Sequence, residues 1–167
     1  MNPIIFFKKN REGMLTSLTL SSSSAAMPAN IQTCTNKLGI SPLVCSFSIP
    51  LGATINMDGT CIFLTITGLF LARAYGVAVP GAAIVSLAIT IILLSLGCPG
   101  VPGAAAVCLG IVLADLGVPI EASGLVMGVI PFLDMVITMS NTTGDVAASL
   151  IVARSEGLVD LEIFNEK

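Results

Sequence analysis

The chain contains no histidine and no tryptophan, and only 10% of its 167 residues are charged. Histidine is the commonest general base and a common metal ligand, so its absence disfavours most hydrolytic and transition-metal chemistry. Soluble domains carry roughly 25% charged residues. The shortage of charge, together with 54% hydrophobic residues and a mean hydropathy of +0.98, indicates an integral membrane protein.

The five cysteines are scattered singly through apolar sequence, with no CxxC pair. This pattern is typical of small buried side chains rather than of disulfides or metal ligands. Basic residues are few and stand mainly at the ends of apolar segments, so no nucleic-acid surface is expected. The cluster from Lys8 to Arg11 is typical of a cytoplasmic flank under the positive-inside tendency.

A run of serines interrupts the first apolar stretch. Residues 13–36 are free of charge, but Ser21 to Ser24 lie near their middle and Pro28 follows. Each arm then has about twelve residues, and a helix of that length covers about 18 Å of a hydrocarbon core about 30 Å thick. Neither arm can cross the core, so we expect a re-entrant helical hairpin over residues 13–37 with its serine tip near the bilayer midplane.

A second charge-free stretch is broken at residues 98–103, Cys-Pro-Gly-Val-Pro-Gly. Proline and glycine at that density end a helix. The arm that follows is again short. The sequence therefore predicts a second re-entrant hairpin over residues 80–117.

A broken span separates the two hairpins. Residues 41–75 are apolar except around Asn56-Met57-Asp58-Gly59, where glycine and short polar side chains favour an unwound backbone. A carboxylate at the bilayer centre costs roughly 2.5–3.5 kcal/mol on insertion scales. We therefore expect a cation to compensate Asp58.

A second span follows the second hairpin, over residues 123–155. Its polar residues recur at i, i+4, i+7 and i+11, which is one stripe of an α-helix. They are Asp134, Thr138, Asn141 and Asp145.

The order hairpin, broken span, hairpin, polar-striped span is one module occurring twice, followed by a solvated cytoplasmic tail over residues 156–167. If the first hairpin enters from the cytoplasm, the span after it forces the second hairpin to enter from outside. The predicted fold is therefore an all-α integral membrane protein with two re-entrant hairpins and two spans in an inverted repeat. Inverted repeats with broken helices and a midplane site are typical of secondary transporters.

Four motifs in this order resemble the dicarboxylate/amino acid:cation symporters, the glutamate-transporter-like family. They are Ser21–Ser24 with Met27-Pro28, Asn56-Met-Asp-Gly-Thr60, Gly100-Val-Pro-Gly103, and Asp134-Met with Thr138-Met-Ser-Asn141 and Gly144-Asp145. The resemblance implies sodium-coupled amino acid symport by an elevator-type transport domain, with co-transported sodium ions and no organic cofactor. It also implies a multi-pass protein of the plasma or bacterial inner membrane.

The resemblance further implies that the chain is the carboxyl-terminal transport core of a longer protein. Family members have several spans before the first hairpin, including the scaffold that holds a homotrimer together. The implied partners are an amino-acid substrate, membrane lipid and two further copies of the full-length protein.

The resemblance also implies a substrate site between the two tips. Half-helix starts favour an anion there, so they suit the substrate carboxylate. Asp134 matches the family residue that binds the substrate ammonium. The other candidate substrate-binding residues are Ser22, Ser23, Thr60, Val101, Gly103, Ile137, Thr138 and Asn141.

Three sodium sites are implied in the same way, all built from oxygen ligands that suit a hard cation. One site uses Asp145, Asn141 and the carbonyls of Gly52 and Asn56. Half of a second site uses Asn56 and Asp58, beside Met57, and its remaining ligands belong to a span outside this chain. A third would use the backbone carbonyls of Thr54, Ser95, Leu96 and Cys98.

Two departures from the family pattern bear on specificity. Ile137 stands where dicarboxylate-selective members carry an arginine, and no arginine stands just before the serines of the first tip, where some members carry one instead. A second substrate carboxylate would then be buried unpaired, which is prohibitive. We expect a neutral substrate such as serine, threonine or alanine; the alternative is a dicarboxylate or acidic amino acid, with sodium or proton coupling. Ile130-Pro131 replaces another acidic residue that the family often has near Asp134.

Other classes of function fit less well. An intramembrane protease needs two facing aspartates, but Asp134 and Asp145 share one helix and lie about 16 Å apart by helical rise. A serine hydrolase needs a base and a GxSxG motif, and the sequence has neither a histidine nor that motif. A fragment that associates with membranes or with a full-length homologue without transporting is the third alternative.

Overall fold

The computed structural model describes residues 1–166, and these residues are mostly helical. The one extended pairing in this part of the chain is an isolated bridge between Ile40 and Val159. The predicted all-α class is therefore confirmed.

The first hairpin consists of α1 (Pro3–Leu20) and α2 (Ser23–Asn36). Asn2 caps α1 by accepting a hydrogen bond from the Ile4 amide at 2.9 Å, and Ser22 caps α2 by accepting one from the Ala25 amide at 3.1 Å. Between the helices Ser21 adopts a left-handed conformation with φ of 48°.

The first arm of this hairpin is longer than predicted, because α1 begins at Pro3 rather than near residue 13 and has 18 residues. The charged residues that precede residue 13 fit on the outer side of the helix. The inward side is lined instead by residues at helical spacing, namely Phe6, Asn10, Gly13 and Ser17.

The broken span consists of α3 (Pro42–Ile55) and α4 (Asp58–Ala74). The interruption comprises Asn56 and Met57, so the prediction of an unwound backbone is confirmed for these two residues. It is wrong for Asp58 and Gly59, which form the first turn of α4. A carboxylate in the first turn of a helix is favoured by the helix dipole.

The second hairpin consists of α5 (Gly81–Gly97) and α6 (Ala104–Asp115), joined by residues 98–103. Gly103 has φ of 81°, which a residue with a side chain rarely adopts. A 3₁₀ turn, η1 (Ile120–Ser123), and the short helix α7 (Gly124–Met127) then lead to α8 (Ile130–Ser155), and α9 (Leu161–Asn165) closes the described chain.

The last span thus starts at Ile130 and not near residue 123, as the sequence predicted. Gly124 and Gly128 are poor helix formers, and Pro131 lacks an amide hydrogen, so it fits only in the first turn. The predicted polar stripe does lie on α8 and all four members are buried: Asp134, Thr138, Asn141 and Asp145.

Within residues 1–166, two segments are long and apolar enough to cross a membrane by length and composition, Pro42–Ala74 and Ile130–Ser155. The first of these includes the break at Asn56 and Met57. The helices α5 and α6 are apolar but shorter.

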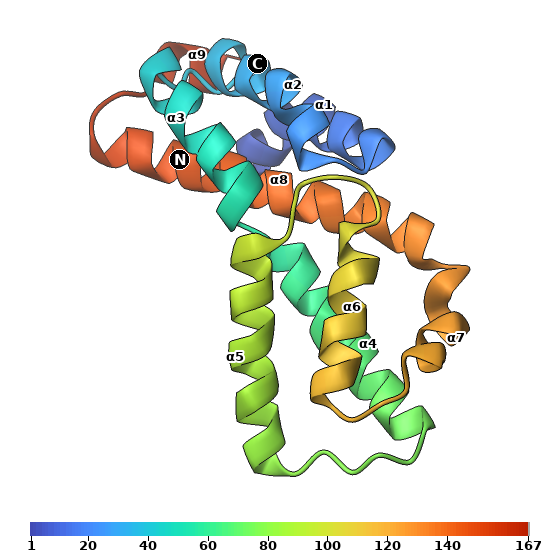
Figure 1. The fold of residues 1–167 in the computed structure, drawn as a ribbon. Coiled ribbons are helices and arrows are strands. Elements are labelled where there is room, and N and C mark those ends of the chain that lie inside the picture. Colours follow the sequence, from blue (N-terminus) through green and yellow to red (C-terminus); the bar gives the residue numbers. More distant parts are fainter. Residues whose placement is uncertain (167) are drawn as a thin grey trace.

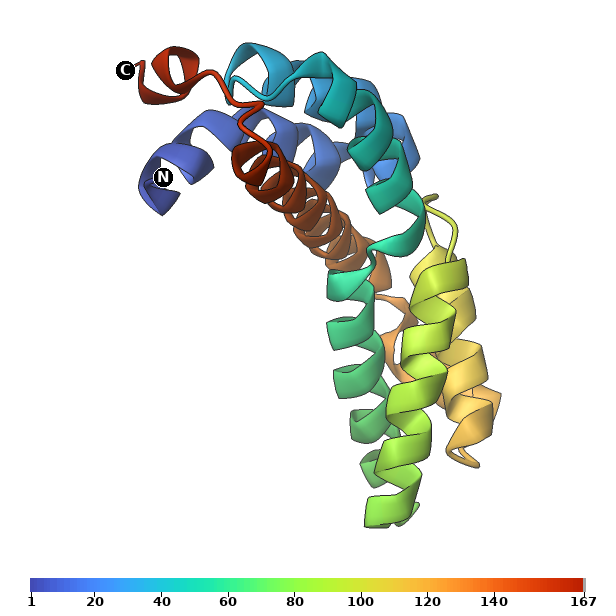
Figure 2. The ribbon, with the colours of Figure 1, turned by 90° about the vertical axis from the view of Figure 1, so that its left-hand side faces the viewer.

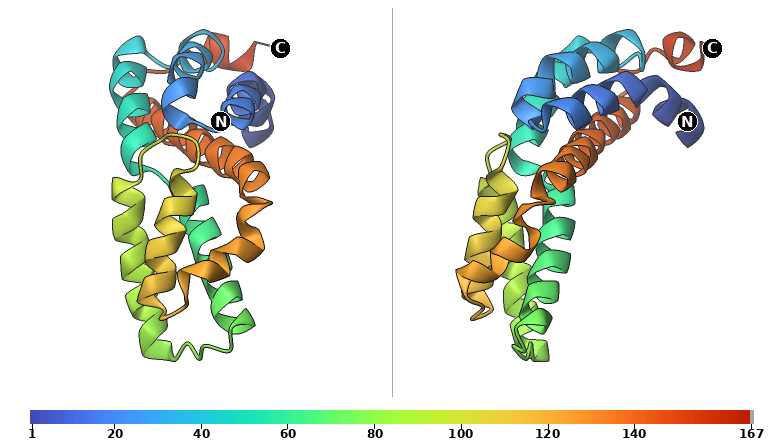
Figure 3. Two further views of the ribbon diagram at one scale, coloured as in Figure 1. Left: turned by 45° about the vertical axis from the view of Figure 1, so that its right-hand side comes forward. Right: turned by 90° about the vertical axis from the view of Figure 1, so that its right-hand side faces the viewer.

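The helices form two halves joined by α8. Helices α1, α2, α3 and α9 lie at one end, and α4 to α7 lie at the other, with α8 running between them (Figure 1). The molecule bends where the halves meet, as Figures 2 and 3 show.

Each half has its own hydrophobic core. The first-hairpin half is built around Cys34, Leu38, Ile49, Val146, Leu150 and Phe164. The second-hairpin half is built around Leu64, Leu71, Leu109, Val112, Leu113 and Ile137. The tips of the two hairpins meet at the junction, beside the break between α3 and α4.

Candidate functional site

The two hairpin tips are joined through the carbonyl of Gly100. That oxygen accepts hydrogen bonds from the Ser22 hydroxyl at 2.7 Å and from the Ser24 amide at 3.2 Å. A Cβ atom at position 100 would lie 3.0 Å from the Ala53 carbonyl oxygen, so the close approach requires glycine. This role of Gly100 was not predicted, although the residue belongs to the Pro-Gly motif of the second tip.

Both tips enclose a small cavity together with α4, α6 and α8. Its volume is about 20 Å³, which is enough for about one water molecule. Seven of the nine predicted substrate residues line it: Ser23, Thr60, Val101, Asp134, Ile137, Thr138 and Asn141. The cavity therefore coincides with the predicted substrate site.

The other two predicted substrate residues take different positions. Ser22 does not line the cavity, because its hydroxyl caps α2 and donates to Gly100. Gly103 is outside the lining as well, but its amide donates to Asp134 Oδ2 at 2.9 Å. Five lining residues were not among the predicted site residues: Ser21, Pro99, Gly100, Ala104 and Ala105. The first three belong to the motifs at the two tips, whereas Ala104 and Ala105 are small and carry no pattern that would single them out.

Asp134 is a buried carboxylate, 7% exposed, on the wall of this cavity. Its one hydrogen bond to the rest of residues 1–166 comes from the Gly103 amide. In the same part of the chain the single ion pair joins Lys37 to Glu12, far along the sequence from Asp134. The carboxylate charge is therefore left without a basic partner among the described residues.

Asn141 ties α8 to the start of α4. Its Oδ1 accepts a hydrogen bond from the Gly59 amide at 2.8 Å, and its Nδ2 donates to Thr60 Oγ1 at 3.3 Å and to Met57 Sδ at 3.2 Å. A Cβ at Gly59 would come within 2.7 Å of the Ile137 carbonyl oxygen. The glycine allows α4 to start directly against α8.

The first predicted sodium set is brought together by the structure. Asn56 Nδ2 donates to Asp145 Oδ1 at 2.9 Å and to the Asn141 carbonyl at 3.2 Å. Gly52 lies against the same carboxylate, since a Cβ there would be 2.3 Å from Asp145 Oδ1. These four residues form an oxygen-rich cluster between α3, the helix break and α8.

The second predicted set, Asn56 and Asp58, is also close together. Asn56 Nδ2 and Asp58 Oδ2 lie 2.8 Å and 3.0 Å from the position that a Cβ of Gly144 would occupy. Asp58 is exposed, however, and not enclosed by the described residues. Its compensation by a cation stays a prediction.

The third set lies on the ends of two helices. Thr54 is near the end of α3, while Ser95, Leu96 and Cys98 are at the end of α5, and these two helices pack against each other. The approach of Gly100 to the Ala53 carbonyl places the second tip beside the end of α3. The joint use of their carbonyls as ligands stays a prediction.

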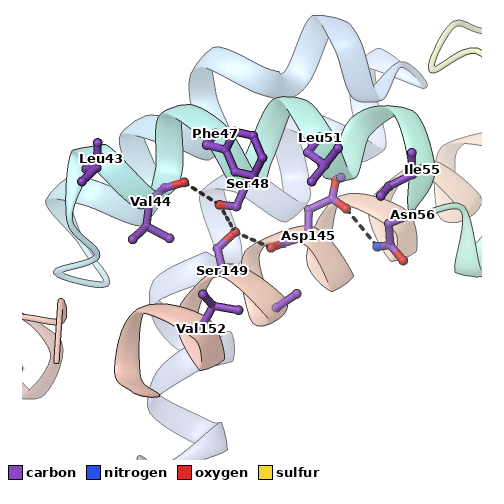
Figure 4. Close-up of a pocket in the computed structure, with 12 residues that line it drawn as sticks. Leu43, Val44, Phe47, Ser48, Leu51, Ile55, Asn56, Asp145, Ser149 and Val152 are labelled. Atoms are coloured by element: carbon purple, nitrogen blue, oxygen red, sulfur yellow. Dashed lines mark hydrogen bonds between the residues drawn. The ribbon is translucent and has the colours of Figure 1, made fainter. Parts of the chain in front are cut away.

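A groove of about 710 Å³ runs along α3 and α8, and three residues of the first predicted sodium set, Gly52, Asn56 and Asp145, line it. Leu43, Phe47, Leu51 and Val152 line its apolar part (Figure 4). A row of polar groups runs along its floor, where the hydroxyls of Ser48 and Ser149 lie 2.7 Å apart and Ser149 donates to the Asp145 carbonyl (Figure 4). Polar groups of both α3 and α8 therefore lie on the floor of this groove, next to Asp145.

Comparison with known proteins decides the family. Residues 1–155 match the model of the sodium:dicarboxylate symporter family. The chain belongs to this family. The symporter family is one of transporters and not of enzymes, and sodium is the ion that it couples.

Curated relatives agree with the symporter assignment. The chain is 36% identical over 153 residues to excitatory amino acid transporter 3 of Mus musculus, covering 92% of this chain and 29% of the relative. It is 35% identical over 144 residues to excitatory amino acid transporter 2 of Homo sapiens, covering 86% and 25%. An excitatory amino acid transporter of Caenorhabditis elegans is 34% identical over 151 residues, covering 90% and 30%. The chain thus spans between a quarter and a third of the length of these relatives.

Proposed function

We propose that this chain forms the substrate- and sodium-binding core of a sodium-coupled amino acid symporter. The observation that carries the proposal is the buried Asp134 carboxylate on the wall of a cavity closed by two hairpin tips. A buried charge without a partner is strongly disfavoured, so a positively charged group is expected to complete the site.

An amino acid supplies groups that match this cavity. Its ammonium would pair with Asp134, and its carboxylate would lie at the tips, where backbone amides at the start of α2 and α6 favour an anion. Thr138 and Asn141 line the same wall and offer polar groups to hold the molecule in one orientation.

Sodium coupling is supported by the cluster around Asp145. Its carboxylate and the nearby backbone carbonyls, those of Gly52 and Asn56 among them, are hard ligands that suit an alkali cation, and no histidine is available in the sequence to relay protons. A cation bound there would raise the electrostatic potential in the substrate cavity because it would lie nearby. Asn141 contacts both places: its carbonyl accepts from Asn56 beside Asp145, and its side chain lines the cavity.

The side chain that the site selects is proposed to be neutral. Ile137 lines the cavity and is buried, and none of the lining residues is basic. A second substrate carboxylate would then lack a partner in the described site. The names of the relatives favour the second candidate, an acidic amino acid, whose distal carboxylate would need a cation from outside residues 1–166.

The tips must separate for an amino acid to enter, because the cavity of about 20 Å³ holds no more than a water molecule. The proposed arrangement is two re-entrant hairpins in an inverted repeat, with the second tip as the gate. The proposed context is an elevator-type transport domain in a homotrimeric, multi-pass protein of the cell membrane.

The test is uptake by the full-length transporter that carries this chain, reconstituted in liposomes. Uptake of labelled serine or alanine should require an inward sodium gradient and should stop when potassium or choline replaces sodium. Undiminished uptake without sodium, driven by a proton gradient, would contradict the proposed coupling. Strong inhibition by aspartate with none by neutral amino acids would instead support the acidic candidate.

A further inference from the structure

A hollow of about 420 Å³ lies at the base of the first hairpin, where α1, the end of α2 and the C-terminal residues meet. Four of the side chains that line it are basic: Lys8, Lys9, Arg11 and Lys37. The amides of Asn36 and Asn165 line it as well, so the hollow offers many hydrogen-bond donors.

The positive charge of the hollow is only partly neutralised. Lys37 pairs with Glu12, and this ion pair lowers the pKa of Glu12. Lys9 donates to the Ile163 carbonyl, which is an uncharged acceptor. Within residues 1–166, Lys8, Lys9 and Arg11 have no carboxylate partner. With Glu12 and Glu166 both counted against the four cations, two positive charges remain in excess.

Exposed apolar side chains lie on α1 beside two of these cations, Lys8 and Arg11. Ile4 is 75% exposed and Phe7 is 52% exposed, and they lie one turn before Lys8 and Arg11 respectively. Long basic side chains beside exposed apolar ones are typical of a helix at the membrane interface. A free anion would use only the cations, whereas a lipid would use both parts of the surface.

The distribution of basic residues assigns this end of the molecule to the cytoplasmic side. Besides the four basic residues at the hollow, Arg154 lies near the same end of the molecule. It stands at the end of α8, and Leu158 just after that helix accepts a hydrogen bond from the amide of Ser41, which follows α2 and Lys37. Arg73, at the end of α4, is the one remaining basic residue in the described part of the chain. Basic residues favour the cytoplasmic leaflet, whose anionic lipids attract them.

We propose that this hollow binds an anionic phospholipid, with its phosphate headgroup at Lys8, Lys9 and Arg11 and its acyl chains along Ile4 and Phe7. The lipid phosphate offsets part of the excess positive charge, and the lipid holds the base of the first hairpin at the membrane surface. The site is separate from the cavity around Asp134 and does not depend on which amino acid is transported.

The test is a lipid titration of the purified full-length transporter in neutral detergent, read by native mass spectrometry. Phosphatidylglycerol should bind, while phosphatidylcholine should bind far more weakly. The double variant Lys8→Gln/Arg11→Gln should bind phosphatidylglycerol about thirtyfold more weakly, since each basic residue near an anionic surface contributes about a factor of five. Arg73→Gln is the matched control and should bind like the parent.

Two further arms separate a lipid from a soluble anion. Inorganic phosphate and glycerol phosphate, each in excess, should leave bound phosphatidylglycerol in place, and Ile4→Ser/Phe7→Ser should weaken binding with all cations intact. Circular dichroism of each variant checks that the helices are retained. Equal retention of the two lipids, unchanged binding by the Lys8/Arg11 variant, or displacement by inorganic phosphate would each overturn the proposal.

Discussion

The two hairpins close the same cavity, but their arms are held together by different chemistry. In the first hairpin, a buried side-chain hydrogen bond joins the arms: Asn30 Nδ2 of α2 donates to Ser17 Oγ of α1 at 3.3 Å, and Ser17 Oγ in turn donates within α1 to the Gly13 carbonyl at 2.8 Å. In the second hairpin, the side-chain hydrogen bond between the described arms joins Thr90 to Asp115 at 3.0 Å, and it is exposed. The rest of that contact is apolar.

This difference suggests which hairpin moves. Buried hydrogen bonds are directional and costly to leave unmade, so they hold two helices in one arrangement. Apolar contacts are non-directional and tolerate displacement better. Both α1 and α2 also pack on α8, while α5 exposes a long apolar side that includes Ile89, Ile92 and Leu93. We therefore expect the first hairpin to be a fixed wall and the second to be the gate.

The largest effect is expected from Asp134→Asn, which removes the charge that both tips enclose. Loss of a buried charge partner should cost roughly 3–5 kcal/mol, or more than a hundredfold in substrate affinity. Equilibrium binding of the amino acid to the full-length transporter measures this. Asp115→Asn, which changes an exposed carboxylate of α6, is the control and should bind normally. Binding by Asp134→Asn within a few-fold of the parent would make Asp134 a structural residue.

The next effect concerns the substrate class. Ile137→Arg should shift preference toward aspartate by tenfold or more, on the order of 1.4 kcal/mol, because a guanidinium can pair bidentately with a second carboxylate. Competition uptake with alanine and aspartate provides the measurement. Ile137→Met keeps the apolar volume and should leave the preference unchanged. An unaltered ratio in Ile137→Arg would mean that position 137 does not face the substrate side chain.

The contrast between the hairpins can be tested directly by removing one hydrogen bond from each. Ser17→Ala should destabilise the protein by about 1–3 kcal/mol, because it leaves the buried Asn30 amide without its acceptor. Thr90→Ala should cost less than about 0.5 kcal/mol, since its hydrogen bond is exposed. Denaturant unfolding of the two variants in the same detergent gives the comparison. Equal losses would remove the proposed difference in stiffness.

A smaller effect is expected at the contact between the tips. The added methyl of Gly100→Ala would lie 3.0 Å from the Ala53 carbonyl oxygen and 3.1 Å from Ser24 Oγ. The contact between the two tips in the closed state should then be weakened by about 1 kcal/mol, which corresponds to about fivefold in apparent substrate affinity. Gly128→Ala, where a Cβ would meet nothing within 4 Å, is the matched control. Unchanged binding by Gly100→Ala would argue against tight contact in the bound state.

Local patterns predicted much of this fold. The polar stripe from Asp134 to Asp145 follows helical spacing, and its burial on α8 is confirmed. The length of α1 was not predicted, because the charged residues from Lys8 to Glu12 resemble a flank and nothing local shows that the other side of the helix is buried. The start of α8 was predicted about seven residues too early, near residue 123 instead of Ile130. Local sequence was again insufficient, because Gly124 and Gly128 weaken a helix without showing where it begins.

The site was predictable where a motif carries its chemistry and not where it depends on contacts between distant segments. The residues around Asp134 and Asn141 were identified from their motifs and line one cavity. The bonds from Ser22 and Ser24 to the Gly100 carbonyl join residues that are far apart in sequence. The exposure of Asp58 likewise depends on which elements pack beside the start of α4, and apolar neighbours in sequence do not determine that.

Hydrogen–deuterium exchange of the two tips in the full-length transporter tests the central claim most directly. The amides of residues 98–103 should exchange faster without sodium and amino acid and become protected when both are added. The amides of residues 21–24 should remain protected in both conditions. Equal changes at the two tips, or protection that changes only at the first tip, would contradict a fixed first hairpin and a moving second one.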